Sequence, residues 1–203
     1  MVLPTDSKSL PPGSGNGKLF RHTRFLNFEI CERRVTSQMH SSMNPFVVSA
    51  TCYVVSGKLG QHNEWDEALG MAQAALMGVE EMRRWVDAGM EVGSHTCSHA
   101  DLNQLSLAEA GHELLQSKSD LENLLQKPVT QFCYPYGHFS PEHESLVSQS
   151  GYVAATTTHR GRACATDRMT ALPRVPVVRS TYSLQFLLAE GKTQKGAKYR
   201  MGA

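Results

Sequence analysis

Residues 91–106 read EVGSHTCSHADLNQLS and join a short apolar strand to the start of a helix. Two histidines, His95 and His99, follow the strand and are separated by three small residues. Ser106 and Glu109 form the capping-box pattern that begins a helix. A strand, a loop with two histidines and a helix therefore follow one another directly.

The same alternation of strand and helix continues on both sides of this stretch. Strands are expected at 45–55, 90–95, 130–136, 152–158 and 172–178, and helices at 78–89, 106–125, 140–151 and 183–191. This order predicts parallel strands covered by helices, either as an open sheet or closed into a barrel. In both architectures functional residues gather at the C-terminal ends of the strands. His95 lies at one such end and Tyr136 at the next.

Length, charge and hydropathy narrow the class of protein. The chain has 203 residues, enough for one sizeable domain. A net charge of +1 argues against nucleic acid or an anionic membrane as a partner. Because no apolar run approaches the ~18 residues that cross a bilayer, we expect no membrane span. The first residues lack the apolar core of a signal peptide, which predicts a cytoplasmic chain unless its true start is missing.

Composition also divides the chain into three segments. Residues 1–45 form an atypical leader, either disordered or translated in a shifted frame, because they show neither a strand nor a helix period. Residues 46–191 carry the alternating pattern and form the predicted domain, and 192–203 form a basic tail. The five cysteines are odd in number and widely spaced, so we expect mostly buried, reduced thiols.

The two histidines are candidate metal ligands. Neutral imidazole is a common donor to Zn²⁺, and a catalytic zinc usually has three protein ligands and one open position for water. The small residues Thr96, Cys97 and Ser98 would allow the backbone to curl, so that His95 and His99 converge. The alternative is a pair of hydrogen-bonded loop histidines with no metal.

Two further motifs lie at strand ends. YPYG at 134–137 predicts a rigid turn, which could aim a backbone N–H or a phenol at a developing oxyanion. Arg174, in LPRVPV, could hold a carboxylate or a substrate oxygen. The alternatives are a packing turn and a surface ion pair.

Taken in order, these segments resemble the polysaccharide deacetylases with a NodB-type domain, carbohydrate esterase family 4. The matching segments are 50–60, 89–106, 113–125, 132–142, 150–158 and 172–178. The resemblance implies an α/β fold, a distorted parallel (β/α) barrel. It also implies a hydrolase that uses a divalent metal, commonly zinc, to remove N- or O-acetyl groups from acetylated polysaccharides or oligosaccharides.

The resemblance also assigns roles to individual residues. His95 and His99 would be metal ligands, and the backbone N–H of Tyr136 would stabilise the oxyanion. Metal-bound water would attack the acetyl carbonyl, and the amine or alcohol would then leave. Substrate binding is assigned to Tyr134, Pro135, Gly137 and Arg174.

The chain departs from this family at the first strand. The family carries an aspartate pair there, one a metal ligand and the other the general base. Residues 20–30, FRHTRFLNFEI, contain no aspartate, and none occurs between Asp6 and Asp66. We therefore expect a barrel that is incomplete at its N-terminal strand, with Glu29 and Glu32 as the nearest carboxylates.

This departure leaves the activity open. His22, His40, Glu29 or His138 would have to supply a third ligand. Two smaller departures are Cys133 in place of a common arginine and the lack of any histidine after His159. The alternatives to an active deacetylase are a catalytically inactive glycan-binding relative and a truncated gene product.

Overall fold

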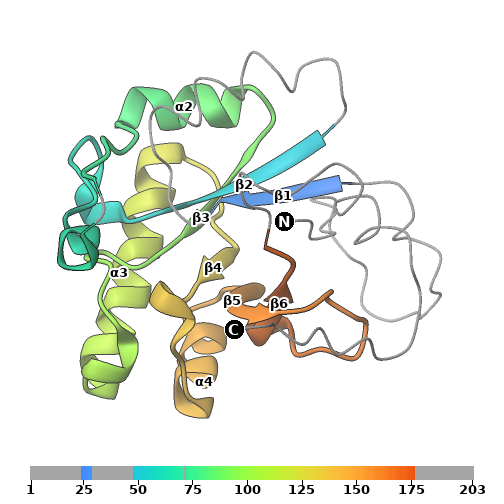
Figure 1. Ribbon diagram of the computed structural model, residues 1–203. Helices are drawn as coiled ribbons and strands as arrows, with labels where there is room; N and C mark the ends of the chain where they lie inside the picture. Colours follow the sequence, from blue (N-terminus) through green and yellow to red (C-terminus); the bar gives the residue numbers. More distant parts are fainter. Residues whose placement is uncertain (1–23, 29–47, 71, 177–203) are drawn as a thin grey trace.

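The structure, a computed structural model, describes residues 24–28, 48–70 and 72–176. Its centre is a parallel sheet flanked by helices (Figure 1). The strands are β1 (Arg24–Phe28), β2 (Val48–Val54), β3 (Glu91–Ser94), β4 (Gln131–Cys133), β5 (Ala154–Arg160) and β6 (Leu172–Arg174). The helices are α2 (Val79–Asp87), α3 (Leu107–Leu125) and α4 (Pro141–Gln149). Short 3-10 turns connect them: η1 (Ser56–Lys58), η2 (Glu64–Leu69), η3 (Leu102–Gln104), η4 (Pro135–Gly137) and η5 (Met169–Ala171).

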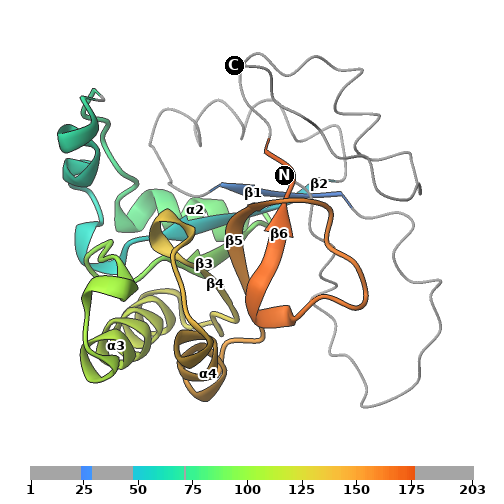
Figure 2. The same ribbon diagram turned by 60° about the horizontal axis from the view of Figure 1, so that its bottom comes forward.

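The strands are arranged in the order in which the chain forms them. Every pair is parallel, from β1 beside β2 through to β5 beside β6. A sequential order without a switch point is that of a (β/α) barrel and not of a doubly wound sheet. The sheet curves from β1 towards β6 (Figure 2). Within the described ranges β1 and β6 are not paired, so the barrel is partial, as the sequence predicted.

The strand β1 occupies the position at which we expected the family's first strand. Its sequence is RFLNF, and it pairs with β2 in register from Arg24 opposite Val48 to Phe28 opposite Cys52. It falls within the segment 1–45, most of which lies outside the described residues. The expected helix at 183–191 and the tail 192–203 also lie outside them.

The two faces of the sheet differ in polarity because strand side chains alternate. Ala50 and Val54 of β2 belong to the apolar core beneath the helices. Thr51 points to the other face, where its hydroxyl donates to Glu91 Oε2 at 3.1 Å and Gln131 Nε2 donates to the same oxygen at 2.5 Å. On the inner side, hydrogen-bonded polar side chains therefore join β2, β3 and β4.

The helices cover the outer face (Figure 1). Helix α3 begins at the predicted capping box, where Ser106 Oγ accepts from the Glu109 backbone N–H. Its Leu114 and Leu121 are fully buried, whereas Leu107, at the first helical position, is 50% exposed. The buried side chains of α3 therefore begin at Ala110, one turn into the helix.

The described cysteines differ in their bonding, and the described helices give no sign of a membrane span. Cys52 is disulfide-bonded, which corrects our expectation of a reduced thiol there. Among the described residues, Cys97, Cys133 and Cys164 form no disulfide. None of the helices in the described part of the chain has the length and apolar character of a membrane span.

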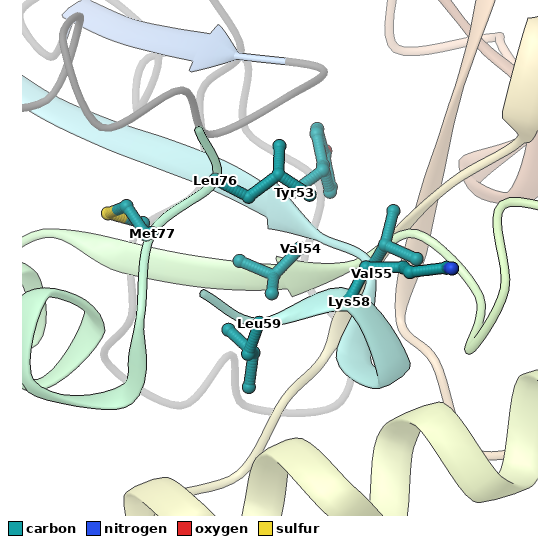
Figure 3. A pocket seen from close by; sticks show the side chains of 7 residues that line it. All are labelled: Tyr53, Val54, Val55, Lys58, Leu59, Leu76 and Met77. Atoms are coloured by element: carbon teal, nitrogen blue, oxygen red, sulfur yellow. The ribbon is translucent and has the colours of Figure 1, made fainter. Parts of the chain in front are cut away.

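A small pocket lies where β2 meets the segment before α2 (Figure 3). Its lining residues are Tyr53, Val54, Val55, Lys58, Leu59, Leu76 and Met77. This lining is almost entirely apolar and does not include His95, His99 or Tyr136. The pocket is therefore a packing feature and not the site that the sequence predicts.

Candidate metal centre

His95 is the first residue after β3, and the backbone holds both its N–H and one nitrogen of its ring. Its backbone N–H donates to Val54 O at 2.9 Å, which fixes the residue beside the end of β2. Its Nδ1 lies 2.7 Å from Cys133 O. Since a carbonyl only accepts, Nδ1 carries the proton and Nε2 keeps its lone pair. Nε2 is buried and has no hydrogen-bond partner among the described residues.

The charge state of His95 also suits coordination. Burial lowers the pKa of His95 from 6.5 to about 4, and the positive charge of Arg174 acts in the same direction. The hydrogen bond to Cys133 opposes this shift but does not outweigh it. The imidazole is therefore neutral near pH 7, which is the form that binds a metal.

This burial predicts acid sensitivity of the metal-free protein. Between pH 6.5 and about 4 the unfolded chain binds a proton at His95 that the folded protein does not. Stability should therefore fall as the pH drops through this window, by up to roughly 3 kcal/mol. Urea unfolding at several pH values measures the slope. His95→Gln should flatten it, and an unchanged slope in that variant would show that another group is responsible.

The loop between the histidines is tightly curled. Thr96 and His99 have φ of +67° and +64°, a left-handed conformation that is uncommon outside glycine and costly for a β-branched residue. Thr96 Oγ1 accepts from the His99 backbone N–H at 3.0 Å. This curl brings the ring centroids of His95 and His99 to 4.8 Å, with the planes at 77°. The two imidazoles therefore lie side by side, as their spacing predicts.

Glu113 of α3 holds this loop from outside, a role that sequence reasoning missed. Its Oε2 accepts the backbone N–H groups of Cys97 at 2.8 Å and Ser98 at 3.0 Å, and its Oε1 accepts the Ser98 hydroxyl at 2.9 Å. On the other side the Gly57 N–H donates to Cys97 O at 2.9 Å. A Cβ at Gly57 would lie 2.7 Å from that oxygen, so only glycine fits.

Glu113→Gln should loosen the histidine loop. The amide loses the negative charge that strengthens three hydrogen bonds, so we expect a loss of roughly 1–3 kcal/mol in the free energy of unfolding. Urea denaturation measures it. The control is Glu80→Gln, which removes an exposed ion pair with Arg83 and should change stability by less than about 0.5 kcal/mol. Equal effects of the two changes would refute the anchoring role.

Aromatic rings enclose His99. The indole of Trp65, on η2, lies parallel to the imidazole with centroids 4.2 Å apart and an interplanar angle of 7°. Tyr136 meets His99 edge-on at 4.8 Å and 84°. Tyr136 is 40% exposed, so its ring borders both the histidine pair and solvent. Burial raises the pKa of Tyr136, and the nearby charges of Asp66 and Asp101 raise it further.

A third imidazole, that of His138, lies beside this group. His138 Nδ1 is 2.9 Å from Asp101 Oδ2, and the ring of His138 lies 6.0 Å from that of Tyr136. The sequence indicates a surface or loop position for His138, with a ligand role as the lesser alternative, and gives no sign of its partner Asp101. The pair joins the loop after His99 to the turn after Tyr136.

The four residues assigned to substrate binding are all buried. Tyr134 is fully buried, stacks on Phe139 and donates its hydroxyl proton to Thr170 O at 2.9 Å. Pro135 and Gly137 are also buried, in the turn η4. Of the four residues in YPYG, Tyr136 is thus the exposed one.

Arg174 of β6 is also buried. Its Nε donates to Thr157 O at 2.5 Å, and its positive charge contributes to the lowered pKa of His95. Contact of Arg174, Tyr134, Pro135 or Gly137 with a substrate stays a prediction.

The described residues do not supply a third metal ligand. Within residues 24–28, 48–70 and 72–176 no three His, Cys, Asp or Glu side chains are grouped to hold a metal ion. His95 and His99 fit as two ligands. The other candidates His22, His40 and Glu29 lie outside the described residues, with Glu29 directly following the end of β1 in the sequence.

Comparison with solved structures gives the same fold. The deacetylase PplD of Streptococcus pyogenes, solved in complex with acetate, has a TM-score of 0.70 at 22% identity over 81% of this chain and 69% of that one. BC0361, a polysaccharide deacetylase from Bacillus cereus, has a TM-score of 0.66 at 23% identity over 82% of this chain and 50% of that one. IcaB from Ammonifex degensii has a TM-score of 0.68 at 17% identity, covering 81% of this chain and 71% of that one.

Comparison of sequences points to the same family of proteins as the comparison of folds. The Bacillus subtilis (strain 168) protein YxkH, whose name places it provisionally among polysaccharide deacetylases, is 26% identical over 135 residues. That match covers 66% of this chain, which spans only 44% of the length of YxkH. The family model for polysaccharide deacetylases matches residues 17–155, which include β1, the histidine loop and the YPYG turn. With the larger part of its length in that match, the chain belongs to the polysaccharide deacetylase family.

Proposed function

We propose that this chain removes acetyl groups from acetylated polysaccharides or oligosaccharides at the site formed by His95, His99 and Tyr136. The observation that carries the proposal is His95. Its Nδ1–H is committed to Cys133 O, while its buried Nε2 has a lone pair with no hydrogen-bond partner in the described structure. A buried neutral imidazole beside a second imidazole suits a metal ligand better than a packing residue.

We propose zinc as the cation. Deacetylases of this family are generally metal-dependent, and neutral imidazole is a common zinc donor. His95 Nε2 and His99 would hold the ion, and the Cys133 carbonyl would orient His95 as the second sphere usually does. When bound, the cation supplies Lewis acidity and makes a water acidic near neutral pH. Glu29 is our candidate for the carboxylate that completes the ligands.

The chain's own groups would act on the acetyl group. Tyr136 and Gly137 both have left-handed φ, +58° and +74°, so the turn is tightly defined. We propose that the Tyr136 N–H donates to the oxyanion that develops on the acetyl carbonyl. Because Asp101 accepts from His138 Nδ1–H, Nε2 of the neutral ring has a lone pair. It would take up the proton that the attacking water loses and then pass this proton to the leaving amine or alcohol.

The test is acetate release from an acetylated chito-oligosaccharide by the purified chain in the presence of zinc. We expect release by the unaltered chain and none by His95→Ala. Binding of the oligosaccharide without acetate release would favour the inactive glycan-binding relative. A broad, non-cooperative thermal melt would identify a chain that does not fold stably, such as a truncated product.

A further inference from the structure

We propose that Trp65 is a positioning residue, whose indole holds the ring plane of His99 for cation binding. The inference rests on the proposed function, because it assigns a task to a residue beside that site. Trp65 has no place in the sequence motifs that identified the histidines. Its contact with His99 emerges only from the fold.

The contact has the geometry of a face-to-face restraint. The two rings are nearly parallel, at 7°, with centroids 4.2 Å apart. The torsion that sets the plane of a histidine ring is broad and weakly restrained by the covalent structure. A flat indole against one face excludes the rotations that would drive the imidazole edge into it. The orientation of the His99 lone pairs would therefore depend on Trp65.

The two other described rings in contact with His99 do not supply this restraint. His95 and Tyr136 both meet it edge to face, with centroids at 4.8 Å. The ring can slide or tilt against an edge at little cost, whereas it cannot rotate through a parallel plane in contact with it. Trp65 is thus the described neighbour that fixes the plane.

The segment that carries Trp65 is itself well anchored. Asn63 is 2% exposed, and its side chain donates to Asp66 Oδ2 at 2.6 Å and accepts from the Ala74 backbone N–H. The Asp66 N–H donates to Asn63 O at 3.1 Å. These bonds lie immediately before and after Trp65, so the indole is presented from a closed turn and not from a loose loop.

Hydrogen bonding does not explain the position of the indole. Trp65 Nε1 is buried and has no hydrogen-bond partner among the described residues. A buried donor without an acceptor is unfavourable, so another interaction must hold the ring where it is. Stacking on His99 is the interaction that the structure offers.

The experiment compares a flat ring with an apolar side chain of similar bulk. Zinc affinity of the whole purified chain is measured by competition with a chromophoric chelator. We expect Trp65→Leu to weaken zinc binding roughly 10- to 100-fold, as loss of a residue that orients a ligand does. Trp65→Phe keeps a flat ring, so its zinc affinity should stay within about 3-fold of that of the unaltered chain. A difference of that size corresponds to the loss of a weak contact.

A spectroscopic readout distinguishes positioning from general stability. Cu²⁺ is used as the probe, because it quenches a nearby indole. The unaltered chain should show saturable quenching at one equivalent. In Trp65→Phe only Trp85 remains, whose Nε1 donates to Glu91 O at the opposite end of β3, and its emission should not respond.

The outcomes separate this inference from the proposed function. If Trp65→Leu binds zinc as tightly as the unaltered chain while His95→Ala does not bind it, the positioning role is wrong and the metal site stands. An equal loss in the Phe and Leu variants would also overturn it. If the unaltered chain binds no zinc, the proposed function and this inference fail together. Should Trp65→Leu not fold cooperatively, Trp65→Met gives the same comparison.

Discussion

Replacing Gly137 with alanine should lower the free energy of unfolding by roughly 2–5 kcal/mol, the sum of backbone strain and overpacking. Gly137 has φ of +74°, and a Cβ there would lie 2.0 Å from Thr158 Oγ1 and 2.7 Å from Thr158 Cβ. Thr158 is on β5, so the turn or the strand would have to move. Because the turn also presents Tyr136 to His99, we expect the change to disturb the site as well.

Gly89 provides a matched control for this prediction. It has a similar φ of +83°, but a Cβ there would meet nothing within 4 Å. Gly89→Ala should therefore show the strain alone, roughly 1–2 kcal/mol. Urea unfolding of both variants measures the difference, which reports the clash with Thr158. Equal losses would mean that the close approach of turn and strand is not rigid.

Much of this fold can be read from local sequence signals. The strand pattern at 45–55 and the capping box at Ser106 and Glu109 predicted β2 and the start of α3, because these features depend on neighbours along the chain. His95 and His99 were found by their spacing and their place after a strand. Their neighbouring rings follow from a curl that small residues permit.

The rest depends on contacts between distant segments. Glu113 is 16 residues from Cys97, and Asp101 is 37 residues from His138, so neither pair has a signal in the linear sequence. The stack of Trp65 on His99 requires the loop after β2 to fold over the loop after β3. The sequence of β1, RFLNF, lacks the aspartate pair that would have identified it as the family's first strand. Only its pairing with β2 in the fold shows that it occupies that position.

Alanine at His95 or at His99 should abolish tight zinc binding. Removing one of two imidazole ligands takes away more than an orienting neighbour would, so we expect the affinity to fall by more than about 100-fold. The loss should be as large for either residue, because both are proposed to donate to the same ion. His112→Ala removes an exposed imidazole on α3 and should leave binding unchanged.

The most direct measurement is the zinc content per chain of the purified, zinc-loaded and desalted protein, by atomic emission. Our account predicts about one zinc per chain for the unaltered protein and for His112→Ala. It predicts none above background for folded His95→Ala and His99→Ala. An unaltered chain without zinc, or histidine variants that retain it, would contradict the proposal that these two imidazoles share a cation.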